Sequence, residues 1–333
     1  MSGSTAHRSW LWLVILGSAL IIALLFSLWA GTLPMTPGEL FAVLSGDASS
    51  PTQHAVVWKI RWPRALLAAL VGAALGSSGG AFQAVLRNPL ADPYILGVSG
   101  GAALGAVIAL TLGIAAPLLL PMAAFCGALA ALALVYWVAQ AYRGSPHTLI
   151  LCGVMVGSLA SALLLFLLWL APADQTRTAI FWLAGNLSSA DPQLLGWTGL
   201  GAGLAFLGLW SQARKLDLFT QGEEVAADLG LAVGRSRLLI FACAGALTAA
   251  AVAIAGLVGF VGLTVPHIVR LLWGPAHRRL LPASALAGAA FLMLADALSR
   301  SLFAPAEIPI GVVTALLGAP FFLYLLRRRE GNL

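Results

Sequence analysis

Charged residues are scarce in this chain of 333 residues. Lysine and arginine number 18 and aspartate and glutamate 12, so 9% of the residues are charged while 60% are hydrophobic. Soluble domains carry about 25% charged residues. A water-soluble globule of this length would have too little polar surface, so the bilayer must be the solvent for most of the chain.

Cysteine and lysine are also rare. The three cysteines, Cys126, Cys152 and Cys243, lie within apolar runs, which excludes a disulfide framework and a cysteine metal site. The only lysines are Lys59 and Lys215, and no GxxxxGK[ST] phosphate loop is present, so the chain cannot cradle nucleotide phosphates by itself. The net charge of +6 is spread between apolar runs, unlike the basic face of a nucleic-acid binder.

Long apolar runs predict an all-α, polytopic membrane protein with one transmembrane domain, residues 1–333. At about 20 residues per crossing, we expect ten spans: 10–32, 64–86, 94–112, 116–141, 148–170, 192–210, 235–257, 259–273, 280–301 and 308–326. The eighth is short, and we expect Pro266-His267 to interrupt it. Segment 176–186 is too short to span and is expected to be a surface helix, or one that dips in beside a pathway. The first run could imitate a signal peptide, but it is long enough to cross.

The distribution of Lys and Arg predicts the orientation. With ten spans both termini share one side, and placing them in the cytoplasm puts 13 positive residues inside and five outside. The outside set is Lys59, Arg61, Arg64, Arg177 and Arg300. Four of these five are arginines close to membrane segments, on the side that has few positive residues. This placement is unusual and suggests that they have a function.

Glycine is abundant, with 36 residues. The pairs Gly72/Gly76, Gly101/Gly105 and Gly153/Gly157 have the small-xxx-small spacing that lets membrane helices approach closely. Spans two to five and seven to ten each contain a proline-bearing break and begin on opposite sides. This pattern suggests an inverted repeat, as in many transporter folds.

One long inward loop, residues 211–234, separates the sixth and seventh spans, and we call it the docking loop. Within it the run 222–231 predicts a short helix with its acids in the first turn and a glycine after its end. The helix could be a solvated loop helix or one that docks into a cytoplasmic partner. Its apolar side favours docking.

Several motifs, in this order, resemble the FecCD-type permeases of type II ABC importers, the group of vitamin B12, haem and ferric-siderophore permeases. They are Arg61-Trp62-Pro63-Arg64, Asn88-Pro89-Leu90-Ala91-Asp92-Pro93, Gly222-Glu223-Glu224, Gly259 to Arg270, His277-Arg278-Arg279 and Glu307-Ile308-Pro309-Ile310-Gly311. The resemblance covers roughly residues 10–328. It implies a homodimer in the bacterial inner membrane that works with two ATPase subunits and a periplasmic binding protein. ATP and Mg would bind to the ATPases, and this chain would hold no catalytic, cofactor or metal site.

The resemblance also implies roles for particular residues. Periplasmic arginines of the family pair with glutamates of the binding protein, and the matching residues are Arg61, Arg64 and Arg300; snorkelling at the interface is the simpler alternative. The residues expected to dock the ATPase are Glu223, Glu224, Val225, Asp228, Leu229 and Gly230.

The family's cytoplasmic gate matches Ser145, Pro146 and His147, where this chain departs from the family's small hydroxyl residues. Small residues expected to line the path are Gly153, Gly157, Ser158 and Ser161, with the tenth span as the other wall. Asp296 precedes Arg300 by one helical turn, so we expect a structural ion pair. His267 is expected to satisfy a broken helix rather than to bind a ligand.

Three rivals to the importer are less well supported. The spans hold almost no Asp or Glu for an ion-coupled transporter, no charged ring or filter for a channel, and no catalytic constellation for an enzyme. The substrate is left open among a ferric siderophore, haem and cobalamin. We prefer an iron chelate, with cobalamin close behind.

Overall fold

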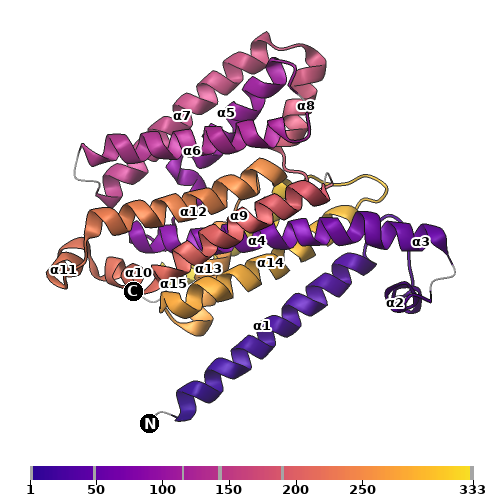
Figure 1. The fold of residues 1–333 in the computed structure, drawn as a ribbon, viewed down its shortest axis with the longest axis horizontal. Helices are drawn as coiled ribbons and strands as arrows, with labels where there is room; N and C mark the ends of the chain where they lie inside the picture. The colour runs from indigo at the N-terminus through magenta and orange to yellow at the C-terminus, as the bar shows by residue number, and fades with distance from the viewer. Residues whose placement is uncertain (1–2, 48–49, 115, 142–144, 189–190, 331–333) are drawn as a thin grey trace.

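The computed structural model describes residues 3–47, 50–114, 116–141, 145–188 and 191–330, and every regular element in these ranges is helical (Figure 1). The elements are α1 (Gly3–Trp29), α2 (Pro37–Ser45), α3 (Pro51–Ala55), the π-helix η1 (Val56–Arg61), α4 (Trp62–Val85), the 3-10 helix η2 (Pro93–Leu96), α5 (Val98–Thr111), α6 (Leu119–Gln140), α7 (Pro146–Leu170), α8 (Ala173–Leu183), α9 (Pro192–Ser211), α10 (Ala213–Gln221), α11 (Glu223–Asp228), α12 (Val233–Ala255), α13 (Val261–Trp273), α14 (His277–Ser301) and α15 (Ile310–Glu330).

Within the residues that the structure describes, six helices are long and apolar enough to cross a membrane. They are the continuous rod Pro51–Val85, which ends in α4, together with α6, α7, α9, α12 and α14. Shorter apolar helices, within α1, α5, α13 and α15, occupy the other four predicted spans. The all-α class is confirmed, and a helix lies at every predicted span. The count of ten crossings stays a prediction.

The centre of the bundle is the contact of α4 with α14. A Cβ atom placed on Gly72 would collide with the backbone of Gly288, and one on Gly76 would collide with the carbonyl of Ser284. Gly101 and Gly105 of α5 face the backbone of α6 in the same way. These glycines therefore pack helix against helix, as their spacing predicts.

The expected interruption at Pro266 is wrong, because α13 runs through it from Val261 to Trp273. Proline removes the hydrogen bond to the carbonyl four residues earlier, that of Gly262. This carbonyl lies against Gly79 of α4, where only a glycine leaves room for it. Close packing of the neighbouring helix thus tolerates the missing bond.

The docking loop also differs from the prediction. Two helices occupy it instead of one: α10, which was not predicted, and α11, which is shorter than the predicted segment 222–231. The short helix predicted near 176–186 is α8. Figure 1 shows α10, α11, the start of α1 and the end of α15 toward one end of the molecule, and α2, α3 and α8 toward the other.

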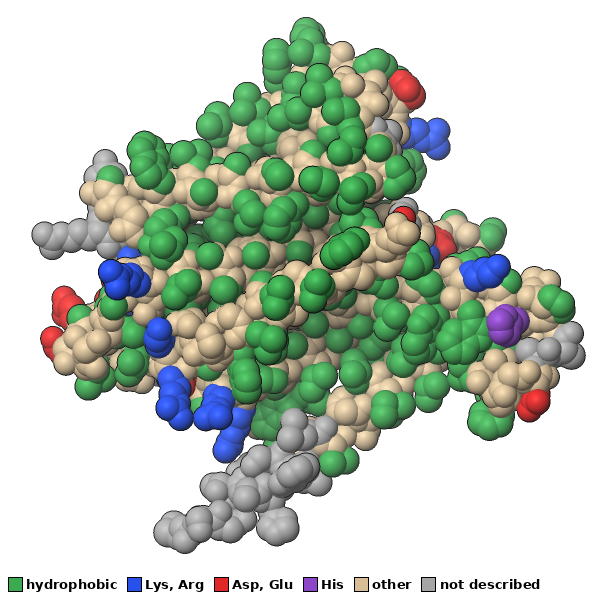
Figure 2. Space-filling model, viewed as in Figure 1, with side chains coloured by type: hydrophobic (Ala, Val, Ile, Leu, Met, Phe, Trp, Pro, Cys, Tyr) green, Lys and Arg blue, Asp and Glu red, His purple; other side chains and the backbone are tan. Residues whose placement is uncertain are grey.

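The outer surface of the bundle is largely apolar (Figure 2). Trp137, Trp169 and Trp197 are 74%, 80% and 74% exposed, and many leucines on α7 and α9 are exposed with them. Large aromatic side chains facing outward would be unfavourable in water, so this surface fits a lipid environment.

Candidate functional site

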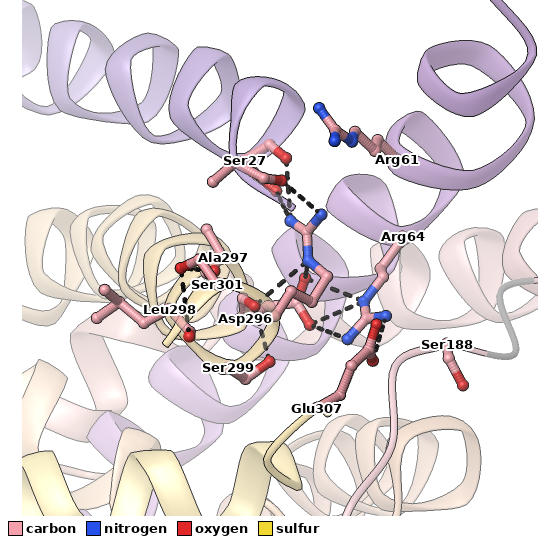
Figure 3. Close-up of polar contacts among 12 residues, drawn as sticks. Ser27, Arg61, Arg64, Ser188, Asp296, Ala297, Leu298, Ser299, Ser301 and Glu307 are labelled. Carbon is pink, nitrogen blue, oxygen red and sulfur yellow. Dashed lines mark hydrogen bonds and ion pairs between the residues drawn. The ribbon is translucent and has the colours of Figure 1, made fainter. Parts of the chain in front are cut away.

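The end of the bundle that carries α2, α3 and α8 contains a buried charge cluster (Figure 3). Nε and Nη2 of Arg64, on α4, each lie 2.9 Å from Oδ1 of Asp296, on α14, and Nη1 donates to Oε2 of Glu307 at 2.9 Å. Asp296 also accepts from Nε of Arg300 at 3.0 Å. The Asp296 side chain is fully buried. Two guanidinium groups therefore compensate one desolvated carboxylate.

Arg61 and Arg300 bind the C-terminal end of α1. Arg300 donates from Nη1 to the carbonyl of Ala30 and from Nη2 to that of Ser27, both at 2.9 Å. Arg61 donates at 2.6 to 2.8 Å to the carbonyls of Leu28, Trp29 and Leu33. The last carbonyls of a helix lack intrahelical partners and carry the negative end of its dipole, so cations bind there favourably. The two arginines thereby attach α1 to the bundle.

Glu307 is the member of this cluster that reaches solvent, with a side chain 40% exposed. It lines a cavity of about 130 Å³ together with Arg64, Asn186 and Ser188. The Arg64 side chain therefore borders a cavity beside the half-exposed Glu307. A carboxylate that entered this cavity would compete with Glu307 for Arg64.

The ion pair expected between Asp296 and Arg300 is confirmed. Arg61, Arg64 and Arg300 are themselves buried, between 2% and 6% exposed, and internal groups occupy their guanidinium groups. Their pairing with a binding protein stays a prediction. Sequence reasoning missed the role of Glu307, although it lies in the Glu307-Ile308-Pro309 motif.

At the opposite end, α11 presents most of the residues predicted to dock an ATPase. Glu224, Val225, Asp228, Leu229 and Gly230 are exposed, with Leu229 at 64%. The exposed face is mixed acidic and apolar, and its docking to an ATPase stays a prediction.

Glu223 differs from its neighbours on α11, because it forms an ion pair with the buried Arg237 of α12. We therefore assign Glu223 to holding α11 on the bundle. The neighbouring helix α10 has Ala213, Leu216 and Phe219 buried.

A second polar contact fixes α10 to the start of α14. Oδ1 of Asp217 accepts from the backbone nitrogen of His277 at 2.9 Å and lies 2.7 Å from its Nδ1. Burial opposes ionisation of this carboxyl, but the hydrogen bonds from His277 outweigh it, so the pKa of Asp217 lies below its ordinary value. The carboxylate is therefore ionised at neutral pH.

The predicted gate residues surround the start of α7. Ser145 is the N-cap, and its Oγ accepts from the backbone nitrogen of Thr148 at 3.2 Å. Pro146 is the buried first residue of the helix, and His147 is exposed. Arg143, counted among the inner positive residues, lies outside the described residues. The gate role stays a prediction.

The four predicted path residues divide into two faces of α7. A Cβ atom on Gly153 would collide with the carbonyl of Ile95, and Gly157 lies beside Gly97, so both glycines pack against neighbouring backbone. Ser158 and Ser161 lie on the exposed face. The role of the four residues in lining a path stays a prediction.

Known proteins resemble this chain over nearly its whole length. The model of the FecCD transport family matches residues 19–328. The permease YvrB of Bacillus subtilis, an uncharacterised ABC transporter permease, is 40% identical over 95% of this chain and 93% of its own length. The vitamin B12 import system permease BtuC of Escherichia coli is 40% identical, covering 95% and 94%. The cobalamin import system permease BtuC of Halobacterium salinarum is 46% identical, covering 84% and 75%.

Solved structures agree with the sequence relatives. An ABC transporter described as being of the metal-chelate type, in an inward-facing conformation, superposes with a TM-score of 0.86 at 34% identity, covering 95% of this chain and 98% of the other. The PsaBC complex of Streptococcus pneumoniae gives a TM-score of 0.55 at 17% identity, a likeness of fold alone.

Proposed function

The chain belongs to the FecCD transport family, and from this premise we propose how it works. It is a type II ABC importer permease for a metal-chelate or vitamin substrate, and it is not an enzyme by itself. We propose that it forms a homodimer, in which each subunit crosses the membrane ten times and has both termini in the cytoplasm. The dimer would receive its substrate from a periplasmic binding protein and its energy from two ATPase subunits. The family match over residues 19–328 carries this proposal.

The proposed path runs between two copies of α7 and α15. The outward face of α7 is apolar and includes Met155, Leu159 and Phe166, each more than half exposed in the single chain. A second copy would cover part of this surface, and Ser158 and Ser161 would line what stays open. Such a weakly polar wall suits a large cargo that must not bind tightly on its way through.

The proposed energy source acts through α11. The chain contains no phosphate loop, so force has to arrive from a separate ATPase. The exposed residues Glu224, Val225 and Leu229 would sit in a cleft of that partner. Movement of α11 would then shift α12 and α10 as packed units and switch the opening from one side to the other.

Cobalamin is the substrate that we propose first, and a ferric chelate is the second candidate. This order reverses the preference drawn from the sequence. It is supported by the B12 and cobalamin permeases among the relatives, while the metal-chelate type neighbour keeps the ferric chelate open. Thermal-shift titration of the partner binding protein with cobalamin, haem and a ferric siderophore tests the order. Stabilisation by an iron chelate alone would reject cobalamin.

Docking of the binding protein is proposed to use Arg64 through an exchange of carboxylates. A partner's carboxylate would enter the cavity and replace Glu307 on the Arg64 guanidinium, as charge-assisted Arg pairs allow. The variant Glu307→Gln removes the internal competitor, so the binding protein should bind up to about fivefold more tightly, since a half-exposed ion pair contributes at most about 1 kcal/mol. Surface plasmon resonance on the purified complex measures this. Weaker binding by the variant would contradict the exchange.

A further inference from the structure

Two helix N-termini at the α10 end carry cations where a helix dipole favours anions. The first turn of α10 holds Arg214 and Lys215, and the first turn of α14 holds Arg278 and Arg279. Neither first turn contains an acid. Because the positive end of the macrodipole lies at a helix N-terminus, these side chains add to a positive potential that is already present. Such a place favours a bound anion.

Hydrogen bonds bring the two N-termini together. Asp217 of α10 binds the first residue of α14, His277, and Nε1 of Trp210, at the end of α9, donates to the carbonyl of Arg278 at 3.1 Å. Across the described part of the chain, the four cations form no ion pair. Asp217 is the one carboxylate in the contacts named here, and it is hydrogen-bonded to His277. Figure 2 shows Lys and Arg side chains gathered at this end of the molecule.

An apolar crevice of about 210 Å³ lies beside α9, deeper in the same region. It is lined by α4, α9, α12 and α14, with Phe206 and Gly203 on α9 and Ala285 on α14. A Cβ atom on Gly203 would meet nothing within 4 Å, so packing within the chain does not explain this glycine. At 1.5 Å per residue, Ala285 lies about 10 Å along α14 from Arg278. This distance between Arg278 and the crevice matches the distance between the headgroup of a phospholipid and the upper part of its acyl chain.

We propose that this place binds one anionic phospholipid. Its phosphate contacts Arg278, Arg279 and Arg214, and one acyl chain enters the crevice between α9 and α14. Basic residues next to membrane helices attract anionic lipids, and Trp210 stands at the interface as such aromatic residues do. The orientation under the proposed function places the lipid in the cytoplasmic leaflet, but the site itself does not depend on transport.

A second crevice on the other side of α9 provides the contrast. It has a volume of about 300 Å³ and is lined by Trp197, Met122 and Gly201 with other apolar or small residues, none of them Lys or Arg. Neither lining contains Lys or Arg. The two crevices differ because Arg278 and Arg279 lie about 10 Å along α14 from the smaller one, where a headgroup would lie.

Native mass spectrometry of the delipidated full-length permease tests the proposal. Phosphatidylglycerol and phosphatidylcholine with identical acyl chains are titrated, together with glycerol 3-phosphate. We expect phosphatidylglycerol to bind more tightly by about fivefold for each contacting arginine. The double variant Arg278→Gln/Arg279→Gln should lose about 25-fold in affinity for phosphatidylglycerol and clearly less for phosphatidylcholine, because choline offsets the charge of the phosphate. Gly203→Leu should weaken both lipids.

Matched variants keep the test decisive. Arg235→Gln removes an exposed cation at the start of α12, and Gly201→Leu fills the other crevice; neither should change the preference for phosphatidylglycerol. Equal affinity for the two lipids, an equal loss in Arg235→Gln, or glycerol 3-phosphate binding as tightly as the lipid would overturn the proposal. If the double variant does not fold, Arg214→Gln carries the same comparison. Failure of this test leaves the importer function untouched, because no ATPase or substrate takes part.

Discussion

At the residue scale, the carboxylate of Asp296 neutralises guanidinium groups that belong to two different helices. Arg64 reaches it from α4 and Arg300 from one turn further along α14. None of the three side chains is more than 7% exposed. A buried pair that loses one partner leaves an uncompensated charge, which costs far more than an exposed pair does. The stability of this end of the bundle should therefore depend on Asp296.

The variant Asp296→Ala should lower the free energy of unfolding by about 3 to 5 kcal/mol, because it leaves the buried Arg300 without a counter-ion and Arg64 with only the half-exposed Glu307. Glu307→Gln is the control, since it removes the half-exposed partner of Arg64 and should cost less than about 1 kcal/mol. Denaturant unfolding of the purified protein in detergent measures both. Similar losses in the two variants would contradict the central role of Asp296.

Sequence reasoning could predict one half of this cluster. The spacing of Asp296 and Arg300 is that of neighbours on a helix face, so their ion pair follows from local geometry alone. Arg64 and Asp296 are 232 residues apart. Their contact depends on α4 packing against α14, which no local pattern specifies. The burial of the arginines was missed for the same reason.

At the element scale, close backbone approach explains the glycine pairs of α4 and α5. A methyl group on Gly72 has no space, because the backbone of Gly288 lies directly opposite. Gly196 of α9 has nothing within 4 Å of its Cβ position. The two positions have the same chemistry and opposite surroundings, so they form a natural pair for comparison.

Gly72→Ala should separate α4 from α14 and destabilise the protein by about 1 to 3 kcal/mol, the usual cost of overpacking a tight contact. Gly196→Ala should be neutral or stabilise by up to about 1 kcal/mol, because alanine favours the helix and meets no neighbour. Thermal unfolding followed by circular dichroism compares them. Equal stability of the two variants would argue against tight packing of α4 on α14.

The exposed face of α11 predicts a defect of coupling without a defect of folding. Glu224→Arg and Leu229→Asp change side chains that contact solvent in the single chain, so unfolding temperature should stay within a few degrees of wild type. ATPase stimulation and uptake in the assembled transporter should fall at least about tenfold if these residues form the centre of the interface. Leu229→Met keeps an apolar contact and should retain coupling. Wild-type uptake by the first two variants would remove the docking role.

The sequence analysis did not predict helix α10 or the continuity of α13. The spacing of Ala213, Leu216 and Phe219 could have indicated α10, since residues three apart share a helix face. The continuity of α13 through Pro266 could not be predicted, because it depends on space beside Gly79 of another helix.

At the scale of the whole molecule, hydropathy predicted the class of protein and the position of each apolar helix. The scarcity of charge alone excluded a soluble fold. The four shorter apolar helices are harder to interpret, since α5 and α13 have 14 and 13 residues. Helices of that length cross only with help from flanking segments. Their places in the bundle follow from packing, which composition does not encode.

We expect this chain to move its cargo only when a separate ATPase drives it. Uptake of labelled cobalamin into proteoliposomes tests this directly, with the permease alone, with its ATPase subunits, and with the ATPases and the binding protein together. We predict ATP-dependent uptake in the complete assembly and no uptake by the permease alone. Accumulation of cargo by the purified permease without companion subunits would contradict it.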